Sequence, residues 1–175
     1  MQPRVIGLDL SLTATGIADG TTERLRPRDV EGSGRLEWLR ESIMWRVAAP
    51  GLHADLVVME GPAYSRALQK GHHEAAGLWW LIRWSLHTER IPTAVVTPSA
   101  LKKYATGKGD ATKPDMRLTL YQRAGFDIRD DNECDAWWLR AMGLDHLGHP
   151  LVEVPKTHRD ALAKVAWPEV TRGTA

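Results

Sequence analysis

The stretch that decides the fold runs from residue 4 to residue 18 and reads RVIGLDLSLTATGIA. Its first half is an apolar run that contains Asp9, and its second half begins another apolar run at Thr15. A buried carboxylate without a partner destabilises a protein by several kcal/mol unless a metal ion or a cation offsets its charge. Asp9 is therefore the first candidate for a functional residue. The alternative is an aspartate that forms a turn at the end of a strand.

Two more acidic residues stand in similar surroundings. Glu60 ends the apolar run 56–59, and Asp135 lies on an otherwise apolar predicted helix. Asp131 and Asn132 precede Asp135 by four and three residues, so both can share its helical face. The alternatives are a solvated loop acid for Glu60 and a helix cap for Asp131.

Acidic and amide oxygens of this kind favour Mg²⁺, with Mn²⁺ as a substitute, over zinc. We expect Asp9, Glu60 and Asp135 to converge at the carboxyl edge of a sheet and bind the metal. Asp131 or Asn132 supplies a fourth oxygen or an outer partner. Two such ions roughly 3.5–4 Å apart catalyse phosphodiester hydrolysis, one activating water and the other stabilising the leaving oxygen.

The composition fits one globular domain. The chain has 175 residues, of which 43% are hydrophobic and 26% are charged. No apolar run approaches the ~20 residues of a membrane span, so no membrane partner is expected. The single cysteine, Cys134, excludes a disulfide framework and favours the cytoplasm. Because the net charge is only +1, any surface for nucleic acid must be local.

Apolar periodicity predicts an α/β fold. Three strands at 4–10, 15–20 and 24–30 form an antiparallel meander, and later strands follow at 56–60 and 94–96. Helices are predicted at 34–48, 75–86, 98–107, 112–125 and from residue 130 or 131 to about 143. Thr97 is the predicted N-cap of the third helix and Gly107 its end, and residues 112–115 resemble a capping box at the start of the fourth. This alternation indicates a mixed sheet with helices on both faces. Residues 1–149 form the main domain, and residues 150–175 form a C-terminal extension with a helix near 157–165.

The ordered motifs resemble the RuvC-type Holliday junction resolvases, especially phage-encoded members. The resemblance rests on the Gly7-Leu8-Asp9 run followed by Thr15-Gly16, on Glu60, and on Asp135-Ala136. It extends to residues 101–113, LKKYATGKGDATK, which have two family features: a lysine on a short helix and a second lysine after a glycine-rich turn. Over residues 5–143 it implies an RNase H-like fold, with a three-strand antiparallel meander plus parallel strands.

The resemblance implies a metal-dependent endonuclease that resolves four-way or branched DNA as a homodimer. The implied catalytic residues are Asp9, Glu60, Asp131, Asp135 and Lys113, and Lys102 and Lys113 would contact DNA phosphates. One departure is Asn132, which stands where the family has an acid. The ligand role of that acid therefore passes to Asp131, or Asn132 binds the metal through its neutral amide oxygen.

A second departure lies in the loop after Glu60. The family has an aromatic residue there that probes the junction centre, whereas here Gly61-Pro62-Ala63 precede Tyr64. Tyr64 is a hypothetical stacking wedge. The predicted DNA-binding set is Tyr64, Arg66, Lys70, Lys102, Lys103, Lys108 and Lys113, and the alternative for each lysine is a solvated surface charge.

Other readings of the sequence remain. Residues 106–113 lack the P-loop pattern, so no nucleotide cofactor is expected, and the histidines lack a zinc motif. The start of the chain also resembles the first phosphate loop of actin-like ATPases, which need a second domain. A flap or RNA–DNA hybrid nuclease and a catalytically silent DNA-binding module stay open. Trp80 and Trp84 lie off the apolar stripe of their helix, which favours a homodimer interface. A phage-encoded protein would act in the host cytoplasm.

Overall fold

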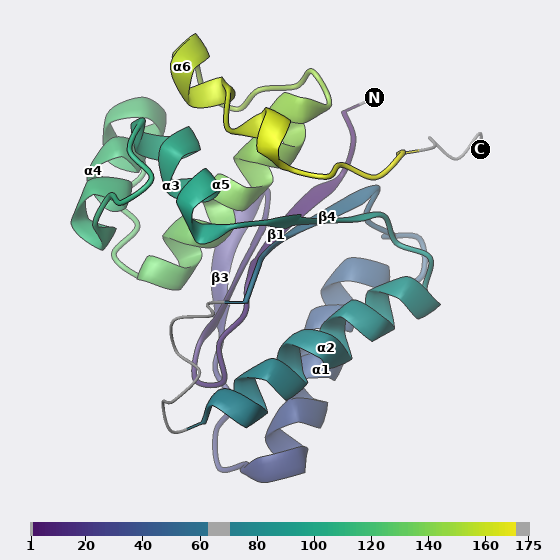
Figure 1. Ribbon diagram of the computed structural model, residues 1–175. Helices are drawn as coiled ribbons and strands as arrows, with labels where there is room; N and C mark the ends of the chain where they lie inside the picture. The colour runs from purple at the N-terminus through teal and green to yellow at the C-terminus, as the bar shows by residue number, and fades with distance from the viewer. Residues whose placement is uncertain (1, 63–70, 171–175) are drawn as a thin grey trace.

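A five-stranded mixed sheet lies at the centre of the structure, a computed structural model that describes residues 2–62 and 71–170 (Figure 1). The strand order is β3-β2-β1-β4-β5. The antiparallel meander consists of β1 (Val5–Asp9), β2 (Thr15–Asp19) and β3 (Thr21–Leu25). The parallel part adds β4 (Leu56–Glu60) beside β1 and β5 (Thr93–Val96) beside β4.

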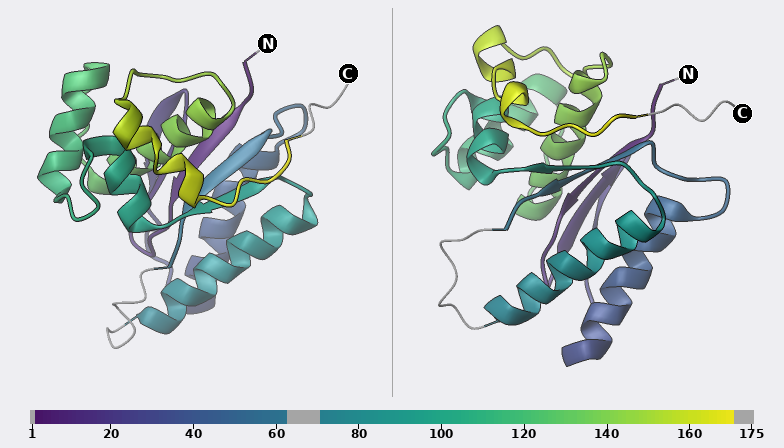
Figure 2. Two further views of the ribbon diagram at one scale, coloured as in Figure 1. Left: turned by 45° about the horizontal axis from the view of Figure 1, so that its top comes forward. Right: turned by 45° about the vertical axis from the view of Figure 1, so that its right-hand side comes forward.

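Helices cover both faces of the sheet, as Figures 1 and 2 show. One face carries α1 (Gly32–Ala48) and α2 (His72–Thr88). The other carries α3 (Pro98–Thr106), α4 (Lys113–Ala124) and α5 (Asp131–His146), followed by the short α6 (Lys156–Arg159) and the 3-10 helix η2 (Leu162–Lys164). The predicted mixed sheet with helices on both faces is confirmed. Within residues 2–62 and 71–170, no helix is both long and apolar enough to cross a membrane.

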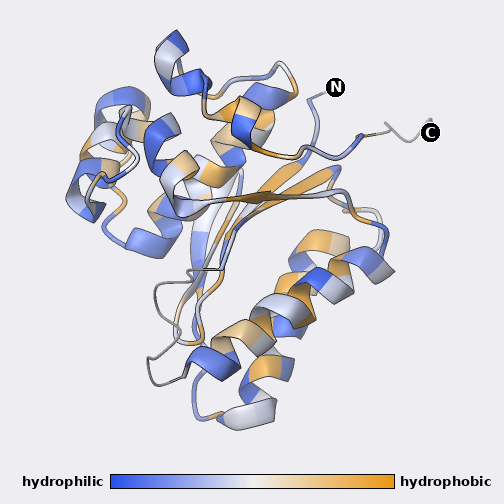
Figure 3. Ribbon diagram, viewed as in Figure 1, coloured by the Kyte–Doolittle hydropathy of each residue, from blue (hydrophilic) through white to orange (hydrophobic). Residues whose placement is uncertain are grey.

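The alternation of side chains along the central strands divides the core in two. Ile6 and Leu8 of β1 pack in the cluster under α1 and α2, whereas Val5 belongs to the cluster under α3 and α5. The central strands β1 and β4 are among the most apolar parts of the ribbon in Figure 3. Because successive strand residues point to opposite faces, Gly7 and Asp9 share the α5 face with Val5. The same alternation in β4 puts Glu60 on that face, since Val58 lies there.

The helices that flank the glycine-rich turn begin and end where their caps predict. Thr97 accepts a hydrogen bond from the Ala100 amide at 3.2 Å to begin α3, and Gly107 ends that helix in the left-handed region with φ 86°. Thr112 and Asp115 form a capping box at the start of α4. Both predicted caps are confirmed, and they fix the ends of the two lysine-bearing helices.

Three predicted boundaries are wrong. The third strand spans Thr21–Leu25 instead of 24–30, because Gly20, with φ 78°, reverses the chain directly after β2. The last long helix continues to His146, since Gly143 is a packing residue: a Cβ there would lie 2.7 Å from the Val5 and Val58 side chains. The single helix expected near 157–165 is instead α6 and η2, separated by two residues.

The backbone of α5 lies directly on β1 and β2 because two glycines leave room for it. A Cβ atom at Gly7 would stand 1.9 Å from the Ala136 carbonyl oxygen, and one at Gly16 would stand 2.0 Å from the Asn132 carbonyl oxygen. Neither distance is physically tolerable, so α5 can rest at this depth only if both positions lack a side chain. The paired Gly7 and Gly16 therefore set the height of α5 above the sheet.

Replacing Gly16 with alanine tests this close contact. Gly16→Ala should lower the free energy of unfolding by about 1–3 kcal/mol or more, because α5 must lift from the sheet. Urea denaturation followed by tryptophan fluorescence would measure the loss. The matched control is Gly34→Ala in α1, where an added Cβ meets nothing within 4 Å and should leave stability unchanged or raised. Equal stability of Gly16→Ala and the wild type would contradict the packing account.

Candidate active site

Asp9 and Glu60 end adjacent parallel strands. The register pairs Gly7 with Val58 and Leu8 with Met59, so the next step along both strands brings Glu60 beside Asp9. Both residues lie at the carboxyl edge of the sheet and on the face covered by α5. Asp9 is only 8% exposed. Two acidic side chains therefore stand close together at the border of the core.

Asp135 approaches the same place from α5. It immediately precedes Ala136, whose carbonyl group meets Gly7, and so the glycine contact carries Asp135 toward the end of β1. Burial raises the pKa of Asp9 well above its ordinary value, and the charges of Glu60 and Asp135 raise it further. Burial also raises the pKa of Asp135 to about 6. The three acids thus act on one another electrostatically, as neighbours in one site do.

Two lysines oppose this negative charge. Lys113 lowers the pKa of both Asp9 and Asp135, and Lys102 lowers that of Asp135. Lys102 is half-buried on α3, and Lys113 is the exposed first residue of α4. The two helices on either side of the glycine-rich turn therefore direct one cation each toward the acids.

The neighbouring residues 131 and 132 have different contacts. Asp130 caps α5 by accepting hydrogen bonds from the Asn132 and Glu133 amides at 3.0 and 3.1 Å, which decides between the two possible caps. Asp131 is thereby left to pair with the Lys113 ammonium, its Oδ2 3.0 Å from Nζ. The Asn132 side-chain amide donates to the Ala14 carbonyl at 2.5 Å, joining α5 to the turn before β2.

The donor chemistry of this group suits a hard divalent cation. All the available ligands are oxygens, Asp9 is buried, and the buried Oδ1 of Asp131 has no hydrogen-bond partner among the described residues. In the described part of the chain, no three acidic, histidine or cysteine side chains are gathered closely enough to hold one ion as they stand. Binding of a divalent cation would therefore require the carboxylates to move closer together, against the repulsion that raises the pKa of Asp9.

The remaining predicted DNA contacts differ in position. Lys103 is half-buried on α3, and Lys108 is exposed in the turn that follows it. Tyr64, Arg66 and Lys70 lie outside the described residues.

Two basic residues that contact the start of α5 have no counterpart in the sequence predictions. Arg117 lies one helical turn after Lys113, and its Nε stands 3.6 Å from Asp131 Oδ1. Arg24 of β3 pairs with Asp130 and Glu133, each at 2.9 Å, and so ties the meander to the first turn of α5. The i, i+4 spacing from Lys113 was a signal for Arg117. Nothing local in the sequence indicated Arg24.

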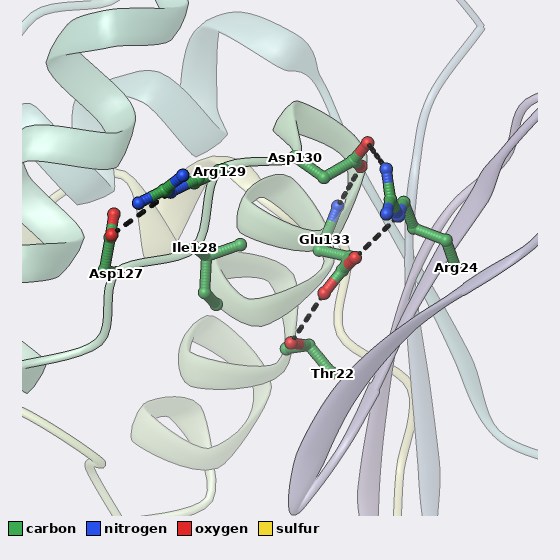
Figure 4. A pocket seen from close by; sticks show the side chains of 7 residues that line it. All are labelled: Thr22, Arg24, Asp127, Ile128, Arg129, Asp130 and Glu133. Atoms are coloured by element: carbon green, nitrogen blue, oxygen red, sulfur yellow. Dashed lines mark hydrogen bonds and ion pairs between the residues drawn. The ribbon is translucent and has the colours of Figure 1, made fainter.

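A polar cavity adjoins the site but is separate from the acids. Figure 4 shows Arg24 in contact with Asp130 and Glu133 at its wall. The cavity has a volume of about 380 Å³ and is lined by Thr22, Arg24, Asp127, Ile128, Arg129, Asp130 and Glu133. Because Asp9, Glu60 and Asp135 are not in its wall, the cavity is not the candidate active site.

Comparison with known proteins places the fold. No protein-family model matches the sequence, and no curated protein matches it. The chain is similar to the solved structure of Thermus thermophilus RuvC, with a TM-score of 0.65 and 15% identity over 85% of this chain and 99% of that one. It is also similar to Thermus thermophilus RuvC in complex with a Holliday junction substrate, with a TM-score of 0.66 and 16% identity over 85% of this chain and 98% of that one.

The fold is therefore that of the RNase H-like proteins, and within them it is RuvC-like. The predicted fold and the structural resemblance are both confirmed.

The raised pKa of Asp135 predicts a pH effect on stability. Since the folded-state pKa of about 6 exceeds that of the unfolded chain, Asp135 stabilises the fold at low pH and loses this contribution as the pH rises through 6. Without divalent cations, Asp135→Asn should raise the free energy of unfolding at pH 7 by roughly 2 kcal/mol. Its stability should also fall less than that of the wild type between about pH 4 and pH 7.

Urea denaturation in EDTA across this pH range would measure both effects. Asp110→Asn, in an exposed turn, is the matched control and should follow the wild-type profile. An Asp135→Asn protein that is less stable than the wild type at pH 7 would contradict the electrostatic account.

Proposed function

We propose that this protein is a metal-dependent endonuclease that cuts branched DNA, with the four-way junction as its preferred substrate. One observation carries the proposal: Asp9, Glu60 and Asp135 share one edge of a RuvC-like fold, with Lys102 and Lys113 directed toward them. Thermus thermophilus RuvC, which has the same fold, is known in complex with a Holliday junction substrate.

Mg²⁺ is the proposed cofactor, with Mn²⁺ as a substitute. Asp9, Glu60 and Asp135 would hold it, and Asp131 or Asn132 would add an oxygen. When bound, the metal would supply the Lewis-acid chemistry that phosphodiester hydrolysis needs. The acids by themselves repel DNA, so the phosphate backbone also requires cations beside them.

The lysines meet that requirement. Lys102 and Lys113 would bind the phosphates of the scissile strand and stabilise the charge that develops at the phosphorus. The capping box at Thr112 fixes the start of α4, and Asp131 holds the Lys113 ammonium at 3.0 Å. Asp131 would thus keep Lys113 beside the acids even when no DNA is bound.

Cleavage of matched labelled substrates tests the proposal. A four-way junction, a flap, a linear duplex and an RNA–DNA hybrid would each be incubated with Mg²⁺ and with EDTA. We expect paired, metal-dependent nicks in the junction. Preferential cutting of the flap or hybrid would keep the nuclease and replace the substrate. Junction binding without any cutting would instead indicate a catalytically silent DNA-binding module.

Neutral replacements of the acids should separate cleavage from binding. Asp9→Asn and Glu60→Gln should lower the junction cleavage rate by about 10³-fold or more, because metal ligands are lost. Both should retain or improve junction binding in a gel-shift assay, since negative charge is removed. Glu41→Gln, on an exposed position of α1, is the control and should cleave normally. Normal cleavage by either site variant would show that the residue does not bind the metal.

Dimerisation is part of the proposal, because paired cuts need two sites. Its support is a group of exposed tryptophans on adjacent helices: Trp45 of α1 is 70% exposed, and Trp80 and Trp84 of α2 are 67% and 60% exposed. Sedimentation equilibrium should give a dimer for the wild type and a monomer for Trp80→Glu/Trp84→Glu. A wild-type monomer at micromolar concentration would contradict this part of the proposal.

A further inference from the structure

One buried carboxylate joins three helices far from the acids described above. Asp145, near the end of α5, has a side chain only 1% exposed. It accepts a hydrogen bond from the hydroxyl of Tyr104 in α3 at 3.0 Å. It also accepts two from Arg159 in α6, from Nε at 3.0 Å and from Nη2 at 2.7 Å. A bidentate arginine is the strongest single partner for a carboxylate, so α3, α5 and α6 are fixed at this point.

The residue before Arg159 holds the end of α3. His158 Nδ1 lies 3.2 Å from the carbonyl oxygen of Tyr104, in the last turn of α3, where helical carbonyls lack partners within the helix. The same ring covers Gly107, since a Cβ there would stand 2.6 Å from His158 Nε2. Glycine is therefore needed at position 107 for two reasons: the positive φ and the space that the His158 ring occupies.

Residues 150–170, which we call the strap, make these contacts and continue across neighbouring helices. Arg123 of α4 donates to the Glu153 carbonyl at 2.7 Å. Ala161 is fully buried in the core under α5, and Trp167 stacks on His146 with ring centroids 4.3 Å apart. Figures 1 and 2 show the strap, in yellow, lying along α3 and α5. It thus joins the helices that carry Lys102, Lys113 and Asp135.

The position of α3 sets the position of Lys102. Tyr104, two residues after Lys102, meets the ring of Trp138 edge-on at 6.1 Å and then reaches Asp145. These two contacts hold α3 along α5. The charge of Lys102 on α3 lowers the pKa of Asp135 on α5. Asp145 lies ten residues after Asp135, or about 15 Å along the helix axis, so the strap acts on the site from a distance.

We propose that the strap positions Lys102 for the scissile phosphate, and that Arg159 is the positioning residue that acts through Asp145 and Tyr104. The inference rests on the proposed nuclease function. Its basis is that a single carboxylate accepts from both α3 and the strap, while the neighbouring His158 fixes the end of α3.

A double-mutant cycle tests whether Arg159 acts through Lys102. Arg159→Ala and Lys102→Ala should each lower the junction cleavage rate at saturating DNA by about tenfold, because the phosphate contact is lost or displaced. Arg159→Ala in the Lys102→Ala background should cause no further loss of rate. Its effect on thermal stability should be the same in both backgrounds. Lys164→Ala, an exposed strap residue, is the control and should match the wild type.

Two results would overturn the inference. One is a cleavage rate for Arg159→Ala that equals the wild-type rate. The other is a double variant whose loss is the product of the two single losses, which would mean that Arg159 and Lys102 act independently. If Arg159→Ala does not fold, Tyr104→Phe replaces it in the cycle, since it removes only the hydroxyl that reaches Asp145.

Amide hydrogen exchange separates this inference from the proposed function. If the wild-type protein cuts no branched DNA, the proposed function fails. Hydrogen exchange in Arg159→Ala then still tests whether the strap fixes α3. Faster exchange confined to α3 would support a strap that fixes this helix. Exchange that rises equally in α3 and β1 would overturn it, because Arg159 would then only stabilise the whole fold.

Discussion

The contact between the α5 backbone and the first two strands is the constraint on which the rest of the structure depends. Gly7 and Gly16 allow the Ala136 and Asn132 carbonyl groups to reach the sheet at distances that any Cβ would prevent. At this height, Asp135 stands over the end of β1, and the Asn132 amide reaches the Ala14 carbonyl. A helix one side-chain layer higher would leave Asp9 and Asp135 too far apart to share a site.

The electrostatic balance of the site follows from that packing. Burial and like charge raise the pKa of Asp9, while Lys102 and Lys113 only partly oppose the effect of the acids on one another. Buried carboxylates that repel one another lower the stability of the fold near neutral pH. Natural proteins retain such carboxylates chiefly at functional sites. The arrangement is what a divalent cation and a phosphate backbone would stabilise, and this links the fold to the proposed chemistry.

The sequence predicted those features that depend on neighbouring residues. The apolar runs at 4–10 and 56–60 predicted the strands that carry Asp9 and Glu60, and local hydrogen-bonding residues predicted the caps of α3 and α4. Features set by contacts distant in sequence were missed. The pairing of Arg24 with Asp130 joins residues 106 positions apart, and the Arg159–Asp145 contact depends on how the strap folds back. The sequence predicts a helix end near Gly143, and the packing role of this glycine is not visible there because its partners lie in β1 and β4.

The central claim is that the three acids brought together by this packing form a divalent-cation site. Titration calorimetry of Mn²⁺ into the wild type and into Asp9→Asn, near pH 6 and in buffers of different ionisation enthalpy, tests it most directly. We predict binding by the wild type with release of protons, because the raised pKa of Asp135, about 6, leaves part of this acid protonated at this pH. Asp9→Asn should lose most of that binding. Equal binding by both proteins, or none by the wild type at millimolar Mn²⁺, would contradict the account.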